Sequence, residues 1–290
     1  MGAEPRTLAP PERRMAEVTS NTRLGAYDLL VARDIAGPED PRPGQFYMLS
    51  AGERWGGGTG ERPYLPRAFS FARVRRRPGG GAELLFLLED VGPGTHRLGE
   101  LGPGDALALV GPLGVGFRPP TPGNRPLLVG GGIGSAPLLC LHDELIAAGT
   151  AGIELLLGFR SSEYAQAAEL FEAGSPGGEG PTPPTVMNDD GSGGRRGLVT
   201  EPLGEALERD PAATVYACGP PAMLEAVRAL CAQRSVAAQL ALESGMACGF
   251  GACFGCVAPT RKGFVRICVD GPVLDADRLE SALFAGAGHA

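Results

Sequence analysis

The chain has 290 residues, of which 43% are hydrophobic, and this is enough for two or three domains with their own cores. Its formal net charge of -7 excludes nucleic-acid binding as the main function. No apolar segment approaches the length that spans a bilayer and no secretory signal is visible, so we expect a cytoplasmic protein without a membrane partner.

The first domain, residues 18–118, is predicted to be a small antiparallel β-barrel. Short runs of strand-forming residues alternate with Pro- and Gly-rich turns, and almost no helical period is present. A polar tail is expected at residues 1–18, and the glycine-rich residues 56–60 are expected to form a hairpin tip. The expected strands are residues 27–32, 45–50, 68–74, 83–89 and 106–110.

The second domain, residues 119–240, alternates short apolar strands with helical segments. This alternation predicts an α/β fold with a parallel, doubly wound sheet. The Gly- and Pro-rich residues 173–184 are expected to form a surface loop within it. The expected strands are residues 127–130, 153–157, 185–187 and 214–218, and the expected helices are residues 138–148, 200–208 and 222–233.

A glycine-rich turn follows the first strand of the second domain. Gly131, Gly132 and Gly134 precede the helix, where a dinucleotide pyrophosphate could approach the free N–H groups of the helix N-terminus. The spacing differs from G-x-G-x-x-G, and a tight turn without a ligand is an equal alternative. Cys218 and Gly219 end a later strand at the same edge of the sheet, which favours NAD binding there.

Four cysteines mark a small third domain, residues 241–290. Cys248, Cys253 and Cys256 form a C-x4-C-x2-C run, and Cys268 follows. This is the plant-type spacing of [2Fe-2S] ligands, and the glycines between them let the backbone pass close to a cluster. A zinc site is the main rival, although four-cysteine zinc sites usually contain two C-x2-C pairs. Disulfides are disfavoured because the seven cysteines are an odd number.

The order of the predicted domains resembles that of the ferredoxin-NADP reductase superfamily. A barrel comes first, and a nucleotide domain follows in which one strand ends at Cys-Gly-Pro-Pro-Ala-Met. Residues 67–70, Arg-Ala-Phe-Ser, resemble its R-x-Y-S flavin motif. The resemblance implies that Arg67 pairs with the FAD pyrophosphate, that Phe69 packs on the flavin beside Ala68, and that Ser70 lies near the reactive nitrogen. Each role suits the side chain, because a cation offsets phosphate charge, a ring covers a ring and a hydroxyl hydrogen-bonds to a nitrogen.

Two further segments of the barrel continue this resemblance. Gly94 and Thr95 resemble the turn at the FAD phosphates. Leu87, Leu88 and Glu89 occupy the strand that lines the flavin in relatives, where the last position is basic rather than acidic. The resemblance therefore implies backbone contacts from this strand and leaves a side-chain contact of Glu89 open.

Over residues 20–280 the chain is similar to the electron transfer subunits of dihydroorotate dehydrogenase B. The marks are the cluster loop with the C-x-D-G-P segment that begins at Cys268, and the Asp-Asp-Gly-Ser sequence at residues 189–192. The resemblance implies that Asp190 lies near the bound NAD, whereas the local sequence fits an ordinary turn equally well. Cys218 would flank the nicotinamide or be a core cysteine at a strand end, and Cys140 and Cys231 are expected in the core.

The resemblance implies an electron relay with FAD, a [2Fe-2S] cluster and NAD as cofactors. In that family, dihydroorotate reduces FMN in a separate catalytic subunit, and electrons pass through the cluster to FAD and leave on NAD+ as hydride, in pyrimidine biosynthesis. This chain would then have no catalytic residue for dihydroorotate. Its cluster loop would face the dihydroorotate dehydrogenase catalytic (FMN) subunit, in a heterotetramer of two copies of each.

Two alternatives remain. A flavin and iron-sulfur subunit of a sulfhydrogenase, or of an NADH-dependent ferredoxin:NADP oxidoreductase-type complex, shares these motifs and differs in its partner. A regulatory scaffold without cofactors is the second, and Arg67, Ser70 and the four spaced cysteines argue against it.

Overall fold

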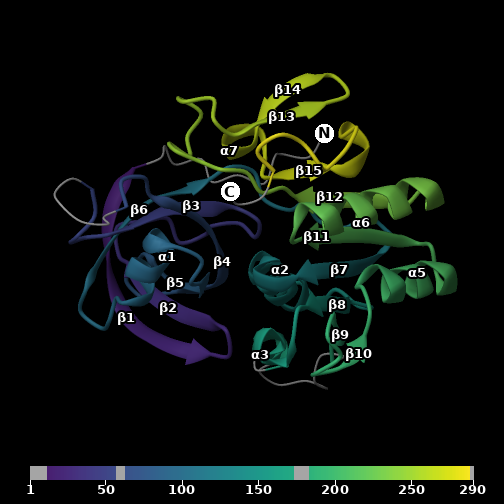
Figure 1. Cartoon of the computed structure of the whole chain (residues 1–290), viewed down its shortest axis with the longest axis horizontal. Coiled ribbons are helices and arrows are strands. Elements are labelled where there is room, and N and C mark those ends of the chain that lie inside the picture. Colours follow the sequence, from purple (N-terminus) through teal and green to yellow (C-terminus); the bar gives the residue numbers. More distant parts are fainter. Residues whose placement is uncertain (1–11, 57–62, 173–182, 288–290) are drawn as a thin grey trace.

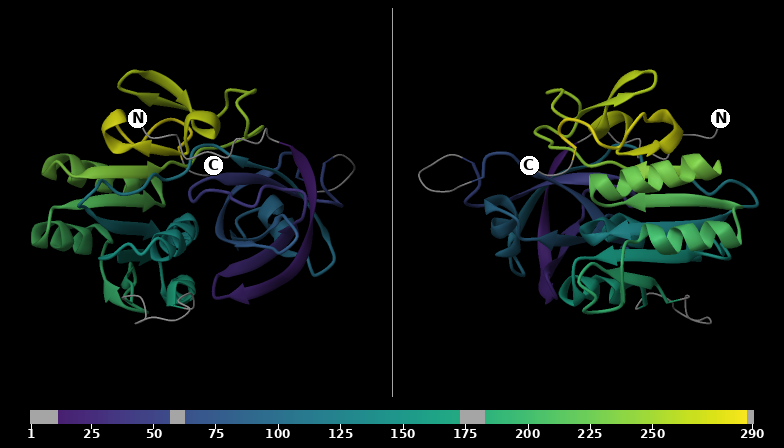
Figure 2. Two further views of the ribbon diagram at one scale, coloured as in Figure 1. Left: turned by 180° about the vertical axis from the view of Figure 1, so that it is seen from behind. Right: turned by 45° about the vertical axis from the view of Figure 1, so that its right-hand side comes forward.

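The computed structural model describes residues 12–56, 63–172 and 183–287. Figure 1 shows a barrel beside a sheet flanked by helices, with the C-terminal segment lying across the top of both, and the views in Figure 2 agree with this arrangement. Residues 57–60 of the expected hairpin tip, the start of the expected tail and residues 173–182 of the expected loop lie outside the described residues.

The first part is a closed antiparallel barrel, as predicted. Its strands follow the order β1-β2-β5-β4-β3-β6, and a short helix that the sequence did not predict, α1, follows β5. The expected strands are confirmed to within a few residues at their ends. The bounds are β1 Arg13–Leu24, β2 Tyr27–Asp34, β3 Phe46–Ala51, β4 Arg67–Arg76, β5 Ala82–Glu89, α1 Pro93–Gly99 and β6 Ala106–Leu113.

Strand β1 corrects the expectation of a polar tail up to residue 18. Its inward side chains are Arg14, Ala16 and Val18, so a charge occupies one of the core positions and hides the alternation of a strand. The Arg14 guanidinium donates to the Asp34 carboxylate at 2.7 Å and to the carbonyl oxygen of Gly111 at 2.8 Å. A buried charge is tolerated when it is paired and hydrogen-bonded in this way.

The second part is the predicted doubly wound sheet. Strands β10, β9, β8, β7, β11 and β12 are parallel in this order, and the two faces have separate cores. Helices α5 and α6 pack with Leu127 and Val129 of β7, whereas α2 packs with Leu128 on the other face. The bounds are β7 Arg125–Gly131, α2 Ser135–Ala147, β8 Glu154–Phe159, α3 Ser162–Ala165, α4 Glu169–Glu172, β9 Thr185–Asn188, β10 Arg195–Arg196, α5 Thr200–Arg209, β11 Ala213–Cys218, α6 Pro221–Arg234 and β12 Ala237–Ala241.

The C-terminal part is hydrogen-bonded to both of the others. It contains β13 Val257–Thr260, β14 Gly263–Arg266, α7 Ile267–Asp270 and β15 Val273–Asp275. Strand β15 pairs antiparallel with β12 and so becomes an edge of the nucleotide-domain sheet. Just before it, the carbonyl oxygen of Gly271 accepts a hydrogen bond from the N–H of Val115, which follows β6 of the barrel, at 2.5 Å. The cluster segment is therefore not a mobile appendage.

Cys140 on α2 and Cys231 on α6 are buried, as expected for core residues. Within the described parts of the chain, no helix is both long and apolar enough to cross a bilayer.

Glu225 on α6 anchors the residues that follow β15. Its carboxylate accepts hydrogen bonds from Arg228 Nη2 at 2.6 Å, from the N–H of Ala282 at 2.6 Å and from the Ser281 hydroxyl at 3.0 Å. The pKa of Glu225 is lowered to about 2, first by the Arg228 hydrogen bond and then, against the effect of burial, by the Ala282 and Ser281 hydrogen bonds. The ionised carboxylate is therefore the form that the folded chain favours.

Glu225→Gln should lower the free energy of unfolding by roughly 1–2 kcal/mol, because the charge-assisted hydrogen bonds to the C-terminal segment are lost. The folded pKa lies below the ordinary value of 4.5, so this contribution is complete above that pH and is lost as the pH falls towards 2. Denaturant unfolding of both proteins near neutral pH and near pH 3 measures the difference, which should shrink in acid. Glu208→Gln removes an exposed partner of Arg234 and is the control; equal losses in both variants would contradict the anchoring role.

Candidate functional site

Two cavities lie where the barrel, the sheet and the C-terminal segment meet. The first has a volume of about 450 Å³ and the second about 640 Å³. Glu89, Ile133 and Glu243 line both cavities, so the two spaces adjoin. This position, outside the carboxyl ends of the parallel strands, is where ligands bind in open α/β sheets.

The first cavity contains most of the residues predicted for FAD. The start of β4 supplies Arg67, Ala68, Phe69 and Ser70, all half-buried and held in register by pairing with β3. The cavity thus offers a cation, an aromatic ring and hydroxyl groups, which is the set of groups that a flavin dinucleotide requires. The other predicted residues that line it are Leu87, Glu89, Thr95, Gly134 and Cys218.

Gly94 does not line the cavity but positions Arg67. A Cβ atom at Gly94 would lie 2.5 Å from Arg67 Nε, so the guanidinium occupies the space that a side chain would need. The Arg67 guanidinium also lies 5.9 Å from the centre of the Trp55 ring and donates to the Leu65 carbonyl at 2.5 Å. Leu88, by contrast, points into the barrel core and lines neither cavity.

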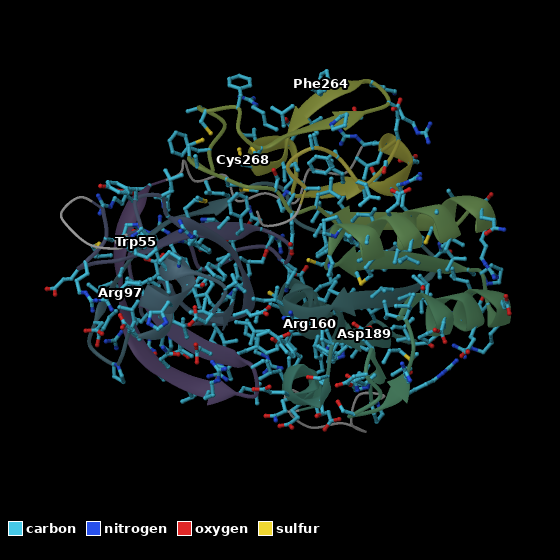
Figure 3. The ribbon with its side chains drawn as sticks, in the orientation of Figure 1. Trp55, Arg97, Arg160, Asp189, Phe264 and Cys268 are labelled. Carbon is cyan, nitrogen blue, oxygen red and sulfur yellow. The ribbon has the colours of Figure 1, made fainter. Side chains whose placement is uncertain are left out.

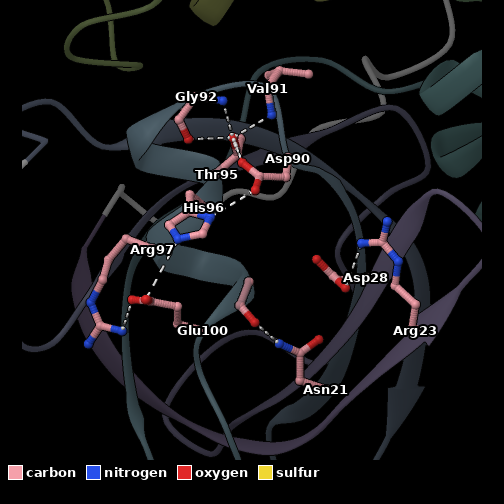
Figure 4. A network of polar contacts seen from close by, with 11 residues as sticks. Asn21, Arg23, Asp28, Asp90, Val91, Gly92, Thr95, His96, Arg97 and Glu100 are labelled. Atoms are coloured by element: carbon pink, nitrogen blue, oxygen red, sulfur yellow. Dashed lines mark hydrogen bonds and ion pairs between the residues drawn. The ribbon is translucent and has the colours of Figure 1, made fainter.

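Thr95 holds the turn that leads into α1 (Figure 4). Its hydroxyl oxygen accepts hydrogen bonds from the N–H groups of Val91 at 2.9 Å and Gly92 at 3.0 Å. Behind it, Asp90 pairs with His96 at 2.8 Å, and this hydrogen bond raises the pKa of His96. The turn is thereby closed from both sides, and Thr95 remains at the wall of the first cavity.

The predicted glycines of the nucleotide domain have two different reasons to be glycine. Cβ atoms at Gly131 and Gly134 would lie 2.6 Å from Met223 Sδ and 2.5 Å from the Cys218 carbonyl oxygen, so both allow two sheet-edge turns to pack closely. Gly132 has a positive φ of 54° and lines the second cavity, where a Cβ would meet only the Tyr27 hydroxyl, at 3.9 Å. A tight turn therefore explains Gly131 and Gly134, whereas Gly132 faces the open space of the second cavity.

Asp190 and Gly219 line neither cavity. Asp190 accepts hydrogen bonds from the N–H of Ser192 at 2.9 Å and from its hydroxyl at 2.7 Å, and these lower the pKa of Asp190. Gly219 has a φ of 155°, and a Cβ atom at this position would lie 3.0 Å from the backbone of Gly131. Both residues shape turns beside the second cavity, and it is the neighbouring Asp189 that lines it.

Several residues that line the cavities belong to loops and are not predicted by any sequence motif. Arg160 and Asp189 directly follow β8 and β9, and Figure 3 labels them beside each other below the middle of the view. Their position at the carboxyl ends of two predicted strands is the signal that could have found them. Residues 242–246, after β12, and Pro272 line the first cavity and carried no such signal.

The four cysteines lie together at the barrel side of the C-terminal part. Cys253 is exposed and Cys248 half-buried, while Cys256 and Cys268 are buried. Hydrogen bonding links Cys248 with Cys253 and Cys256 with Cys268, and the N–H of Cys268 donates to Cys256 Sγ at 3.4 Å. No three His, Cys, Asp or Glu side chains of the described ranges converge on one metal position. The spacing of the four cysteines is that of [2Fe-2S] ligands rather than that of two C-x2-C zinc pairs.

The backbone around Cys248 favours its thiolate. Burial opposes ionisation there, but the N–H groups of Cys253, Phe250 and Ala252 and the Cys253 thiol lower the pKa of Cys248 to about 7. Cys218, which lies outside this group, has its pKa raised far above the ordinary value by burial. The loop thus supports a charged sulfur ligand, whereas Cys218 is an inert thiol at the wall of the first cavity.

Two family models match the chain. The iron-sulfur cluster binding domain of dihydroorotate dehydrogenase B matches residues 243–280, and the oxidoreductase NAD-binding domain matches residues 128–229. 

Similar proteins and structures cover nearly the whole chain. The protein described as dihydroorotate dehydrogenase B (NAD(+)), electron transfer subunit, of Caldanaerobacter subterraneus subsp. tengcongensis is 35% identical over 91% of this chain and 97% of the relative. The protein of the same description from Bacillus caldolyticus is 34% identical over 95% of this chain and 98% of the relative. A solved structure of an NADH-dependent reduced ferredoxin-NADP oxidoreductase superposes with a TM-score of 0.75 at 25% identity, over 92% of this chain and 90% of that chain.

Gly249→Ala should lower the iron content of the purified protein severalfold. Gly249 has a φ of 80°, and a Cβ there would lie 2.5 Å from Met48 Cγ on β3, so the loop would have to leave the barrel. Gly255→Ala is the control in the same loop, because its Cβ would make an ordinary contact of 3.5 Å with Cys253 Sγ. Iron and acid-labile sulfide per chain are measured; equal contents in both variants would show that the close contact with β3 does not position the cysteines.

Proposed function

The chain belongs to the family of electron transfer subunits of NAD(+)-dependent dihydroorotate dehydrogenase B, and we propose that it delivers to NAD+ the electrons that a partner subunit takes from dihydroorotate, in pyrimidine biosynthesis. The observation that carries this proposal is the first cavity, which residues of all three predicted domains line. Arg67 belongs to the barrel, Ile133 to the nucleotide domain and Met246 to the cluster segment. We retain the predicted domains, residues 18–118, 119–240 and 241–290, although β1 begins ahead of the first boundary, at Arg13.

FAD is assigned to the first cavity. Arg67 would pair with its pyrophosphate, Phe69 would pack against the flavin ring and Ser70 would hydrogen-bond to a ring nitrogen. When bound, a flavin exchanges two electrons as hydride with nicotinamide and single electrons with an iron-sulfur cluster, and so it converts between the two. The chain's own contribution is to bind and orient this group and to bring both exchange partners to its edges.

The nicotinamide dinucleotide is assigned to the second cavity. Gly132, open to that cavity, would admit the pyrophosphate, while Gly131 keeps the turn close to α6 and Gly134 keeps it close to β11. Asp190 would act through the turn that presents Asp189. The shared wall of the two cavities then lets the nicotinamide end reach the first cavity.

A [2Fe-2S] cluster is assigned to Cys248, Cys253, Cys256 and Cys268, which would bind it through their thiolates. Exposed Cys253 gives this site an outer edge, and Phe250 and Phe254 beside it are 51% and 64% exposed. Large apolar side chains at the surface are typical of a protein interface. We therefore assign this face to the catalytic FMN subunit, and thiolates of this kind fit a reducing, cytoplasmic compartment.

A second candidate follows from the ferredoxin-NADP oxidoreductase structure, which shares the arrangement of this chain over nearly its full length. A subunit of such a complex would use the same cofactors with a different partner. The partner therefore decides between the two functions, and the electron transfer assay below separates them.

Gly94→Ala should weaken FAD retention by about 10-fold, since the new Cβ displaces the Arg67 guanidinium from its place at the cavity wall. Gly102→Ala is the control in the same domain, because no atom lies within 4 Å of its Cβ position and Gly102 lines neither cavity. Flavin content after gel filtration, measured by visible absorbance, is the readout. Loss of FAD in both variants, or in neither, would contradict the assignment of Arg67.

The complex with a dihydroorotate-oxidising flavoprotein should reduce NAD+ when dihydroorotate is added. Cys253→Ser should abolish this activity while NADH oxidation by an artificial flavin acceptor continues, because the exposed ligand is lost and the flavin cavity is intact. Cys231→Ala, a buried cysteine on α6, is the control and should retain both activities. A fully loaded complex that fails to reduce NAD+ with dihydroorotate, but transfers electrons from ferredoxin, would support the second candidate instead.

A further inference from the structure

An ion pair joins the barrel to the nucleotide domain at the boundary between the two cavities. Glu89 ends β5 and lines both cavities, and Arg160 follows β8 and lines the second. The Arg160 guanidinium donates a hydrogen bond to the Glu89 carboxylate, although the two residues are 71 positions apart in the sequence. The Arg160 side chain is 64% exposed and that of Glu89 only 19%, so the arginine is the freer of the two.

Two tyrosines extend this pair into one contiguous group. The Arg160 guanidinium carbon lies 4.1 Å from the centre of the Tyr164 ring. The edge of Tyr164 meets Tyr27, with ring centroids 5.6 Å apart. Tyr27 is also the cross-strand neighbour of Glu89 in the β2–β5 ladder. Four side chains from both domains therefore form one wall of the second cavity.

The Tyr27 hydroxyl is an unused hydrogen-bonding group in this wall. Tyr27 is fully buried, and its hydroxyl has no hydrogen-bond partner in the described structure. It lies 3.9 Å from the Cβ position of Gly132, the glycine that opens to the cavity. Leaving a buried hydroxyl unpaired is costly, so such a group calls for a partner that arrives with a ligand.

The charges of the second cavity explain why the arginine matters. Its lining includes the carboxyl side chains of Glu89, Asp189 and Glu243, and Arg160 is the cation among the described residues that line it. A dinucleotide brings two further negative charges on its phosphates. Arg160 is the side chain that can offset them, and Glu89 already engages it.

We propose that Glu89 is a latch, that is, a carboxylate that competes with a dinucleotide phosphate for Arg160. When the dinucleotide binds, the Arg160 guanidinium moves from Glu89 to the phosphate. This movement exposes the Tyr27 hydroxyl, which donates a second hydrogen bond to the ligand. This exchange rests on the dinucleotide site proposed above and adds to it a restraint on affinity. When the dinucleotide leaves, Glu89 takes Arg160 back, so the ion pair favours product release.

ADP-ribose is the probe, because it has the pyrophosphate and lacks the reactive nicotinamide. Isothermal titration of the FAD-loaded full chain should give about 10-fold weaker binding for Arg160→Gln, which loses a charge-assisted contact. Glu89→Gln should bind ADP-ribose about 2- to 5-fold more tightly, the range expected when a partly exposed ion pair no longer competes. The double variant Glu89→Gln, Arg160→Gln should bind ADP-ribose no more tightly than Arg160→Gln alone, because Glu89 then has no arginine to compete for.

Tyrosine variants test the second half of the proposal. Tyr27→Phe should weaken ADP-ribose binding severalfold without lowering the melting temperature of the ligand-free protein, because the lost hydroxyl has no partner there. Tyr47→Phe is the matched control, since Tyr47 is equally buried, also has an unpaired hydroxyl and lines neither cavity. Glu205→Gln, which removes one of two carboxylate partners of the exposed Arg195, controls for a change of net charge.

Three results would overturn the latch. One is a Glu89→Gln variant that binds ADP-ribose as wild type does or more weakly. Another is tightening that persists in the double variant, because Glu89 would then act by plain repulsion of the phosphates. The third is a Tyr27→Phe variant with unchanged affinity and a lower melting temperature, as a water-satisfied structural hydroxyl would give. Wild-type protein that binds neither NADH nor ADP-ribose would remove the proposed dinucleotide site itself.

Discussion

The structure depends on the short segment that leads into β15, because it is hydrogen-bonded to two parts of the molecule at once. The Gly271 carbonyl accepts from Val115 after the barrel, the Pro272 carbonyl accepts from Leu242 at 2.9 Å, and β15 pairs with β12 of the nucleotide-domain sheet. These bonds come directly after Cys268. The last cysteine of the group is therefore fixed relative to the barrel and the sheet together, and electron transfer requires such a fixed separation between its sites.

Close packing of backbone against side chains maintains the same arrangement elsewhere. Gly249 brings the cysteine loop against Met48 of the barrel, Gly94 leaves space for Arg67, and Gly134 brings the turn after β7 against Cys218. In each case a single added methyl group would separate two elements that line a cavity or flank the cysteines. The glycine-rich composition is thus a requirement of the interfaces between domains as much as of turns within them.

The adjoining cavities explain how one chain could serve two kinds of electron exchange. Glu89, Ile133 and Glu243 form the shared wall, and the cysteine segment reaches the first cavity through residues 242–246. Binding at the second cavity can therefore be coupled to the first by side chains that belong to both. The ion pair of Glu89 with Arg160 lies at this wall, which is why a change in dinucleotide binding would act directly where the domains meet.

The sequence by itself determined the barrel, the doubly wound sheet and the group of cysteines, because alternation, helical period and ligand spacing are local patterns. It concealed β1, because one of the core positions of this strand is the charged Arg14 and only the distant Asp34 makes that charge acceptable. It favoured Asp190 over Asp189, since only the folded turn decides which carboxylate faces the cavity. The contacts of Arg160 and Tyr27 at the cavity wall and the pairing of β15 with β12 join residues far apart in the chain. Such contacts exist only in the tertiary structure.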